Sequence, residues 1–337
     1  MQRQMFSHRS VEYQAIHKET IAQFQDFLNT KNQIFLFSST GTGFMEASIR
    51  NCVSKKILCC INGSFGRRFH DVALAHGKIV EKLEFPLGDP ITPERLDEKL
   101  KSCPDVEAVS IVHNETSTGL INPLEKLAKT VKNHNKILLV DAVSSLGGTV
   151  INVDKWNLDV CFTSSQKCFG VPPGLAFGSV SDVALHKSER IKNKGWYFDF
   201  QLWERYQQTA GTPVTSAIPQ ILGLNKMLKL IREWGGKRKF FDLYEKRNKR
   251  VRKGVESIGL KLFPKRGYES PTVSCILSPP HISSPKIFQK MREHGFELAK
   301  GHGTLSKRTF RIGNMGYINF EDIELMLDTL DTVIKDL

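Results

Sequence analysis

Four groups of residues have the types and positions that chemistry requires, and each follows a short β-rich run. Residues 39–43 combine glycines with hydroxyl side chains before a helical pattern, so their backbone N–H groups could bind an anion or form a simple capped turn. Residues 62–66 carry Phe65 between small residues, where its ring could cover a planar ligand or pack in the core. The other two groups are Asp141 and residues 164–167, which end in Lys167.

Asp141 and Lys167 each have several interpretations alone, and they indicate a particular chemistry only in combination. Asp141 ends an apolar run, where a carboxylate is costly unless it is paired, so it could bind a metal, cap a turn or hold a protonated ring nitrogen. No nearby cluster of His, Asp or Glu has metal-ligand spacing, so a metal is not expected. A single lysine is usually a surface residue, but a lysine after a strand could be a Schiff-base nucleophile. An anion loop, a flat aromatic ring, a buried carboxylate and a lysine together match the needs of pyridoxal phosphate.

These four groups can meet only if the elements before them form one sheet. Runs with strand character alternate with stretches of helical spacing through the first half of the chain, which predicts a largely parallel sheet covered by helices on both faces. In such sheets ligands bind at the carboxyl ends of the strands, where all four groups lie. The predicted strands are 34–38, 57–61, 79–85, 107–112, 137–141, 160–164 and 175–180.

The second half of the chain predicts a different organisation. Long helices are expected over 213–258, with Pro213 near a helix start and the pair Gly235-Gly236 as a break between helices. Beyond residue 259 the predicted elements are strands 260–263, 272–277 and 308–312 and helices 285–294 and 320–335. We therefore expect a large domain over 1–235 and a smaller α+β domain over 236–337.

Composition narrows the class of protein. Of the 337 residues, 40% are hydrophobic, which is typical of a globular protein. The net charge of +13 permits anionic ligands. No apolar run approaches the ~20 residues that span a bilayer, and the N-terminus lacks the apolar core of a secretory signal. Seven cysteines without a C-x-x-C pair indicate reduced thiols and a cytoplasmic location.

The segment 237–253 is the most basic part of the chain. It carries nine Lys or Arg residues against two acids, so a nucleic-acid site is one interpretation. However, its apolar residues recur at helical spacing. The pattern therefore favours an amphipathic helix with a solvated basic face.

The sequence resembles the class V aminotransferases, which belong to the fold-type I pyridoxal-phosphate enzymes, and within them the alanine–glyoxylate/serine–pyruvate aminotransferase branch. The similarity extends from His8-Arg9-Ser10 to the last helix, with the motifs in the same order and at matching spacing. These motifs are Thr40-Gly41-Thr42 with Met45-Glu46, residues 62–66, 113–119 and 140–148, Ser165-Gln166-Lys167, Pro172-Pro173-Gly174 and Arg311-Ile312-Gly313. The resemblance implies a large domain with a mostly parallel seven-stranded sheet and a smaller C-terminal α+β domain.

The resemblance also implies a role for each matching residue. Lys167 would hold pyridoxal 5'-phosphate as a Schiff base and move the α-proton, and Asp141 would pair with the ring nitrogen. Arg311 would bind the substrate α-carboxylate, for which a planar guanidinium is suited. Further cofactor contacts are implied for Thr40, Gly41, Thr42, Phe65, Thr116, Gln166 and Thr212. The last of these residues would reach the phosphate of a neighbouring subunit, which implies a homodimer with shared active sites.

The implied reaction is a ping-pong amino transfer between a small amino acid and a 2-oxo acid. We expect alanine or serine as the donor and glyoxylate or pyruvate as the acceptor. Transamination of 2-aminoethylphosphonate with pyruvate stays open, and so does cysteine desulfurization, although desulfurases usually have His where Gln166 stands. A non-enzymatic protein that binds nucleic acid or a membrane through residues 237–253 is the remaining alternative, but we expect neither partner.

Two departures from the family pattern concern the substrate side. Family members usually carry a Gly/Pro-rich segment before the His-Arg-Ser stretch, whereas here only seven residues precede His8. Either the reading frame is short or the substrate site is built differently. In addition, some relatives have Tyr where this chain has Thr209.

Overall fold

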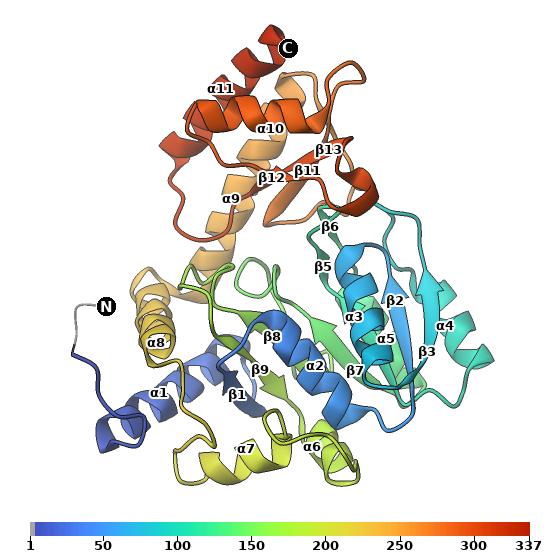
Figure 1. The fold of residues 1–337 in the computed structure, drawn as a ribbon, viewed down its shortest axis with the longest axis vertical. Helices are drawn as coiled ribbons and strands as arrows, with labels where there is room; N and C mark the ends of the chain where they lie inside the picture. The colour runs from blue at the N-terminus through green and yellow to red at the C-terminus, as the bar shows by residue number, and fades with distance from the viewer. Residues whose placement is uncertain (1–3) are drawn as a thin grey trace.

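The computed structural model describes residues 4–337 and has two lobes, of which the larger contains a seven-stranded sheet (Figure 1). The strand order is β1-β9-β8-β7-β4-β2-β3. Strands β2, β3, β4, β7 and β8 are parallel to one another, whereas β9 is antiparallel to its neighbours β1 and β8. The predicted α/β fold with a mostly parallel sheet is therefore confirmed. The strands are β1 Gln33–Phe37, β2 Lys56–Ile61, β3 Ile79–Glu84, β4 Ala108–Val112, β7 Ile137–Asp141, β8 Val160–Ser164 and β9 Ala176–Val180.

Helices cover both faces of this sheet. Side chains of β1 alternate between the faces, because Ile34 and Leu36 join one apolar core while Phe35 and Phe37 join the other. The first core also contains residues of α1, α4, α5 and α8, and the second contains residues of α2, α3, α6 and α7. These helices are α1 Val11–Leu28, α2 Gly41–Cys52, α3 Ser64–Ala75, α4 Pro93–Ser102, α5 Leu124–Asn133, α6 Asp182–Glu189, α7 Phe200–Gln207 and α8 Ile218–Glu233.

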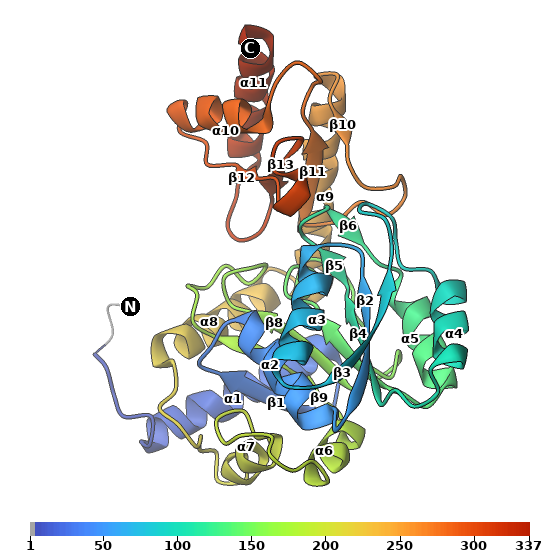
Figure 2. The same cartoon turned by 45° about the vertical axis from the view of Figure 1, so that its right-hand side comes forward.

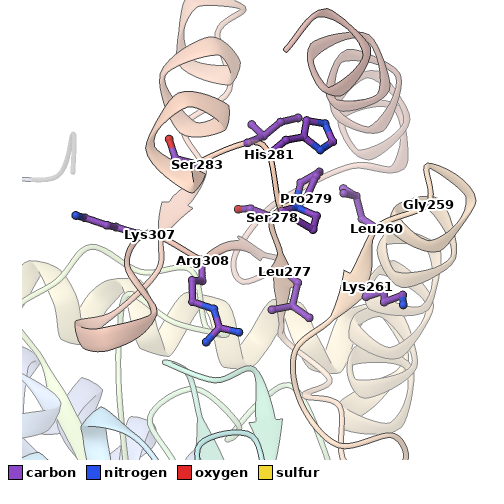
Figure 3. Close-up of a pocket in the computed structure, with 12 residues that line it drawn as sticks. Gly259, Leu260, Lys261, Leu277, Ser278, Pro279, His281, Ser283, Lys307 and Arg308 are labelled. Carbon is purple, nitrogen blue, oxygen red and sulfur yellow. The ribbon is translucent and has the colours of Figure 1, made fainter.

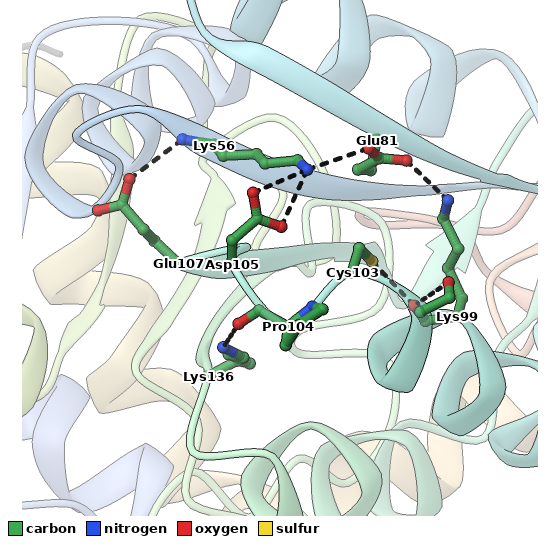
Figure 4. Close-up of polar contacts among 9 residues, drawn as sticks. Lys56, Glu81, Lys99, Cys103, Pro104, Asp105, Glu107 and Lys136 are labelled. Atoms are coloured by element: carbon green, nitrogen blue, oxygen red, sulfur yellow. Dashed lines mark hydrogen bonds and ion pairs between the residues drawn. The ribbon is translucent and has the colours of Figure 1, made fainter.

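Charged side chains join β2, β3 and α4 at the end of the sheet opposite the predicted site (Figure 4). Lys56, the first residue of β2, contacts Asp105 at 2.9 Å and Glu81 at 3.2 Å, and Glu81 also pairs with Lys99 at 2.7 Å. The backbone N–H of Lys56 donates to Glu107 at 3.1 Å. Because Lys56 begins its strand, this network lies away from the carboxyl end and supports the sheet edge.

The smaller lobe is an antiparallel sheet packed against helices. Its strand order is β10-β11-β13-β12, and every pairing in it is antiparallel. The predicted α+β character is confirmed, although β12 and the two-stranded pair β5 Asn114–Glu115 and β6 Leu120–Ile121 were not predicted. The elements are α9 Gly236–Ser257, β10 Lys261–Leu262, β11 Val273–Leu277, α10 Ser284–Glu293, β12 Ala299–Lys300, a 3-10 turn Gly303–Leu305, β13 Thr309–Gly313 and α11 Phe320–Asp336.

Helix α9 runs from one lobe into the other (Figures 1 and 2). Its residues Phe240 and Tyr244 belong to the core of the large lobe, whereas Val251 and Val255 belong to the core of the small lobe. The basic segment 237–253 is thus an amphipathic helix, as its pattern predicts. We propose residues 1–235 and 236–337 as the two domains, with α9 shared by both cores; residues 1–3 lie outside the described part of the chain.

The predicted helix start near Pro213 is wrong, because α8 begins at Ile218. Side-chain hydrogen bonds hold the preceding loop in a different conformation: the Thr212 hydroxyl donates to the Val214 carbonyl at 2.8 Å and lies 3.0 Å from the Ser216 hydroxyl. Such local bonds compete with the helical backbone pattern. Within residues 4–337, no helix is long and apolar enough to cross a membrane.

Candidate active site

The predicted site residues gather at the carboxyl ends of the sheet strands. Asp141 is the last residue of β7, and Lys167 follows the neighbouring strand β8 by three residues. Helix α2 begins after β1 with Gly41, and helix α3 begins after β2 with Ser64. Because β1, β2, β7 and β8 run in the same direction, the groups after them share one edge.

Asp141 is a buried carboxylate with only part of its hydrogen-bonding capacity used. Its side chain is 5% exposed, and Oδ1 accepts from the Val143 N–H at 2.8 Å. Within residues 4–337 the other oxygen, Oδ2, has no hydrogen-bond partner. Burial raises the pKa of Asp141 to about 6, against the lowering effect of the Val143 N–H, and the nearby Glu115 carboxyl raises it further. A carboxylate of this kind is suited to accept a proton-bearing group of a ligand.

Lys167 has an amine that no side chain neutralises. The residue is half-buried, and its Nζ has neither a hydrogen bond nor an ion pair in the described part of the chain. Burial lowers the pKa of Lys167, and the positive charges of Arg311 and Arg68 lower it further, while Asp141 opposes them. Because only the neutral amine is a nucleophile, this environment favours the chemistry predicted for Lys167.

The start of α2 provides an anion-binding geometry. Its N-cap, Thr40, makes no side-chain capping hydrogen bond. A Cβ on Gly41 would lie 2.5 Å from Val143 Cγ2, so only glycine allows the backbone to approach the residue that bonds Asp141. The Thr42 hydroxyl accepts from Arg68 Nη1 at 3.3 Å, and Arg68 has no ion pair among residues 4–337. An uncapped helix start beside an unpaired guanidinium favours an anion.

Glu115 positions Phe65, and sequence reasoning missed this role. Glu115 is fully buried and accepts from the backbone N–H groups of Phe65 and Gly66, both at 3.1 Å, at the start of α3. The Phe65 ring is half-buried, with the Arg68 guanidinium 4.8 Å and the His302 ring 6.1 Å from its centre. The only sequence signal for Glu115 was its position within the motif 113–119.

Arg311 extends from the small lobe to the large lobe. Its Nε and Nη2 donate to the Lys300 carbonyl at 3.0 and 2.9 Å, and its Nη1 donates to the Thr116 carbonyl at 3.2 Å. The Thr116 hydroxyl lies 2.5 Å from the Ser144 hydroxyl, three residues after Asp141. Burial lowers the pKa of Arg311, but a guanidinium keeps its charge in proteins. Arg311 thus contacts Thr116 across the lobes, and its positive charge acts on Lys167.

Two predicted cofactor residues are not joined to this site by contacts within the chain. Gln166 is exposed, and its side chain makes no hydrogen bond in the described residues. Thr212 uses its hydroxyl within its own loop. Their predicted contacts with the cofactor stay predictions.

Two cavities differ in their relation to the candidate site. One of about 540 Å³ lies beside it and is lined in part by Ser64, Arg68 and His302. Another of about 700 Å³ lies in the small lobe, and none of the predicted site residues lines it (Figure 3). The side chains of Lys261, Lys307 and Arg308, which line it, point in different directions, so they do not form a common anion site.

Comparison with known proteins identifies the family. The family model described as aminotransferase class-V matches residues 1–326, and the chain therefore belongs to the class-V aminotransferases. An uncharacterized aminotransferase of Methanocaldococcus jannaschii is 33% identical, over 99% of this chain and 88% of the relative. A Synechococcus protein named as the small subunit of a soluble hydrogenase is 31% identical, over 98% and 87% of the two chains.

Two of the similar proteins are named for glyoxylate. The L-aspartate–glyoxylate aminotransferase of Paracoccus denitrificans is 31% identical over 91% of this chain and 80% of the relative. The crystal structure of an alanine–glyoxylate aminotransferase from Nostoc superimposes with a TM-score of 0.94, at 29% identity, over 98% of this chain and 90% of that chain. The resemblance expected from the sequence is confirmed.

The residues present fit the cofactor of this family, pyridoxal 5'-phosphate. The uncapped start of α2 suits a phosphate, the unpaired amine of Lys167 suits an aldehyde, and the free oxygen of Asp141 suits a protonated ring nitrogen. The protein is thus a pyridoxal-phosphate-dependent aminotransferase.

Proposed function

We propose that this aminotransferase moves the amino group of alanine or serine to glyoxylate or pyruvate. The observation that carries the proposal is the grouping of an unpaired lysine amine, a buried carboxylate and a guanidinium from the opposite lobe. The relatives with named substrates support glyoxylate as the acceptor.

Each site residue has a proposed task. When bound, pyridoxal phosphate supplies an aldehyde that accepts the amino group and a ring that withdraws electrons. Lys167 holds the cofactor through its Nζ and moves the proton at the substrate α-carbon, while Asp141 keeps a proton at the ring nitrogen. Arg311 binds the substrate α-carboxylate through its guanidinium. The residues proposed to orient the cofactor are Thr40, Gly41, Thr42, Phe65, Thr116, Gln166 and Thr212.

We also propose that the enzyme is a cytoplasmic homodimer. The seven cysteines are all free and buried, which is consistent with a reducing compartment. Thr212 is proposed to contribute to the phosphate site of the neighbouring subunit. Two equivalent sites would then lie across a two-fold axis.

A donor with an anionic side chain is a second candidate. Arg68 favours it, because this exposed guanidinium has no ion pair in the described residues and lies beside Phe65. The L-aspartate–glyoxylate relative supports aspartate. The phosphonate of 2-aminoethylphosphonate is the other anionic group that Arg68 could bind.

The experiment is a matrix of donors and acceptors with the purified enzyme. Alanine, serine, aspartate and 2-aminoethylphosphonate are each paired with glyoxylate. All except alanine are also paired with pyruvate, because transfer from alanine to pyruvate regenerates the same two compounds. Both the visible absorbance of the bound cofactor and product formation are measured. We expect the highest kcat/KM for alanine or serine with glyoxylate, and Lys167→Ala should lose both the absorbance band and all turnover. Lys167→Arg should also fail, because a guanidinium stays protonated and is no nucleophile.

Other outcomes would redirect the assignment. A preference for aspartate or the phosphonate that disappears in Arg68→Gln would select the second candidate. Turnover that survives Lys167→Ala would refute the role of Lys167. Release of sulfide from cysteine without any amino transfer would indicate a desulfurase.

A further inference from the structure

Tyr244 lies where the two halves of the site meet. The residue is on α9, is 0% exposed, and makes two hydrogen bonds with its hydroxyl. It donates to the Cys168 carbonyl at 2.5 Å and accepts from the Gly316 N–H at 3.1 Å. Cys168 follows Lys167 directly, and Gly316 lies in the turn after the strand that carries Arg311. One buried oxygen therefore joins the turn after the lysine to the turn after the guanidinium.

The backbones of the same two turns also lie in direct contact with each other. Gly170 has a positive φ of 61°, and a Cβ placed on it would lie 3.2 Å from the Cα of Gly316. The backbones can approach this closely only because both residues lack a side chain. The separation of the two turns is thus defined by steric contact as well as by hydrogen bonds.

Neighbouring residues on the same face of α9 fix the turn after Arg311. Arg247 Nη1 donates to the Gly316 carbonyl at 3.1 Å, and Asn248 Oδ1 accepts from Asn314 Nδ2 at 2.7 Å. Tyr244, Arg247 and Asn248 are all buried, and the latter two lie three and four residues after Tyr244, so they share one helix face with it. Of the three, only Tyr244 also bonds to the segment after Lys167 in the described residues.

We propose that Tyr244 is a positioning residue that sets the distance between the Lys167 amine and the Arg311 guanidinium. This inference rests on the proposed roles of those two residues. A substrate bound by its α-carboxylate presents its amino group at a fixed distance from that carboxylate. Tyr244 keeps the two protein groups at the matching separation, although it contacts neither the substrate nor the cofactor.

Loss of this positioning should affect substrates with an α-carboxylate more than substrates without one. A substrate that carries an α-carboxylate needs both groups at the correct separation, whereas an amine without a carboxylate needs only the lysine end of the site. A displacement of about 1 Å can cost about 100-fold in rate for the former. Burial raises the pKa of Tyr244, so its hydroxyl keeps the proton that it donates to Cys168.

The test compares alanine with ethylamine, which is the same amine without the carboxylate. The holoenzyme is mixed with each compound in a stopped-flow instrument, and the rate of change of the cofactor absorbance is measured. In Tyr244→Phe we expect the second-order rate constant for alanine to fall about 10- to 100-fold, while that for ethylamine changes less than about twofold. Gly170→Ala, which reaches the same contact from the other side without removing a hydrogen bond, should show the same selective loss.

A matched control removes a hydroxyl that also donates one hydrogen bond and accepts another. Thr20 is fully buried on α1, donates to the Ile16 carbonyl at 2.7 Å and accepts from Asn225 Nδ2 at 3.1 Å. Thr20→Val should lower stability without changing the ratio of alanine to ethylamine rates. Hydrogen–deuterium exchange gives a readout independent of activity: peptides covering 167–171 and 313–317 should exchange faster together in Tyr244→Phe and remain unchanged in Thr20→Val.

The outcomes separate this inference from the proposed function. Suppose that the ratio of alanine to ethylamine rates fell in Arg311→Lys but not in Tyr244→Phe or Gly170→Ala. This result would overturn the positioning role of Tyr244 alone. An equal loss for alanine and ethylamine in Tyr244→Phe would reduce Tyr244 to a structural residue and also overturn it. A ratio unchanged even in Arg311→Lys would refute the proposed role of Arg311, and the inference with it.

Discussion

Replacement of Asp141 by Asn should destroy activity and yet stabilise the cofactor-free protein. The amide retains an oxygen that can accept from the Val143 N–H, so the local turn is preserved. It carries no negative charge, so it avoids the cost of a buried carboxylate with one unpaired oxygen. It also cannot keep a proton on the cofactor ring nitrogen, so turnover should fall by orders of magnitude.

The size of the stabilisation follows from the pKa. Burial raises the pKa of Asp141 from 3.8 to about 6, and a difference of about two units corresponds to about 3 kcal/mol. The sign follows from proton binding: between these pKa values the folded state holds more protons than the unfolded state, so stability decreases as the pH rises. The cost of the ionised Asp141 to the free energy of unfolding is absent below about pH 4, about half its full size at pH 5 and nearly complete at pH 8.

The assay is urea denaturation of the cofactor-free protein and of Asp141→Asn at pH 5 and pH 8. The variant should be more stable by about 3 kcal/mol at pH 8 and by about half that amount at pH 5. Subtraction of the two proteins cancels titrations that they share, such as that of buried His113, whose pKa burial lowers to about 3. Cofactor-loaded samples provide the turnover measurement.

Either of two results would refute this reasoning. If Asp141→Asn had the same or lower stability at pH 8, the carboxylate would not be penalised by its surroundings. If the variant kept near-normal turnover, Asp141 would be a residue of the turn and not a partner of the ring nitrogen. Asp141→Glu is the matched control, because it keeps the charge and should retain part of the activity.

Three further perturbations test other parts of the site and fold. Arg311→Lys should lower kcat/KM about 30-fold or more for every amino and oxo acid, while the variant keeps a normal cofactor content. Charge removal at Lys246 and Lys249, on the exposed face of α9, is the control and should leave activity unchanged. Removal of cofactor should weaken the dimer in light scattering, and Thr212→Ala should abolish this linkage; a fully active monomer would exclude shared sites. His17→Leu should stabilise the protein by about 1–3 kcal/mol in urea denaturation, because both ring nitrogens of this fully buried residue lack partners in the described chain. This gain should be larger at pH 5, because burial lowers the pKa of His17 from 6.5 to about 4 and the protein with His17 loses stability as the pH falls through that range. The absence of any gain would mean that the ring is hydrated.

The strands of the large lobe could be predicted because they are short, apolar and separated by helical patterns. β7 Ile137–Asp141 and β8 Val160–Ser164 agree with the predicted bounds to the residue. The position of Lys167 and Asp141 at one sheet edge then follows from topology alone. The two-residue strands β5 and β12 could not be predicted, because their pairing depends on long-range contacts and leaves no local periodicity.

The interactions that orient the site residues were harder to predict than the residues themselves. Glu115 stabilises the start of α3 from a segment about fifty residues further along the chain, and nothing local to either segment indicates the pairing. Tyr244 belongs to the apolar side of the predicted amphipathic helix 237–253, and it packs in the core as that pattern predicts. Its hydroxyl finds its two partners only when both lobes are in place.

The sharing of α9 between two cores has a mechanical consequence. A helix of 22 residues is a stiff rod about 33 Å long, and here each half of the rod is embedded in a different lobe. The lobes cannot swing apart freely, because such a hinge motion would have to bend the rod or extract Phe240 and Tyr244 from their packing. The two walls of the site are thus held at a constant spacing by one continuous helix.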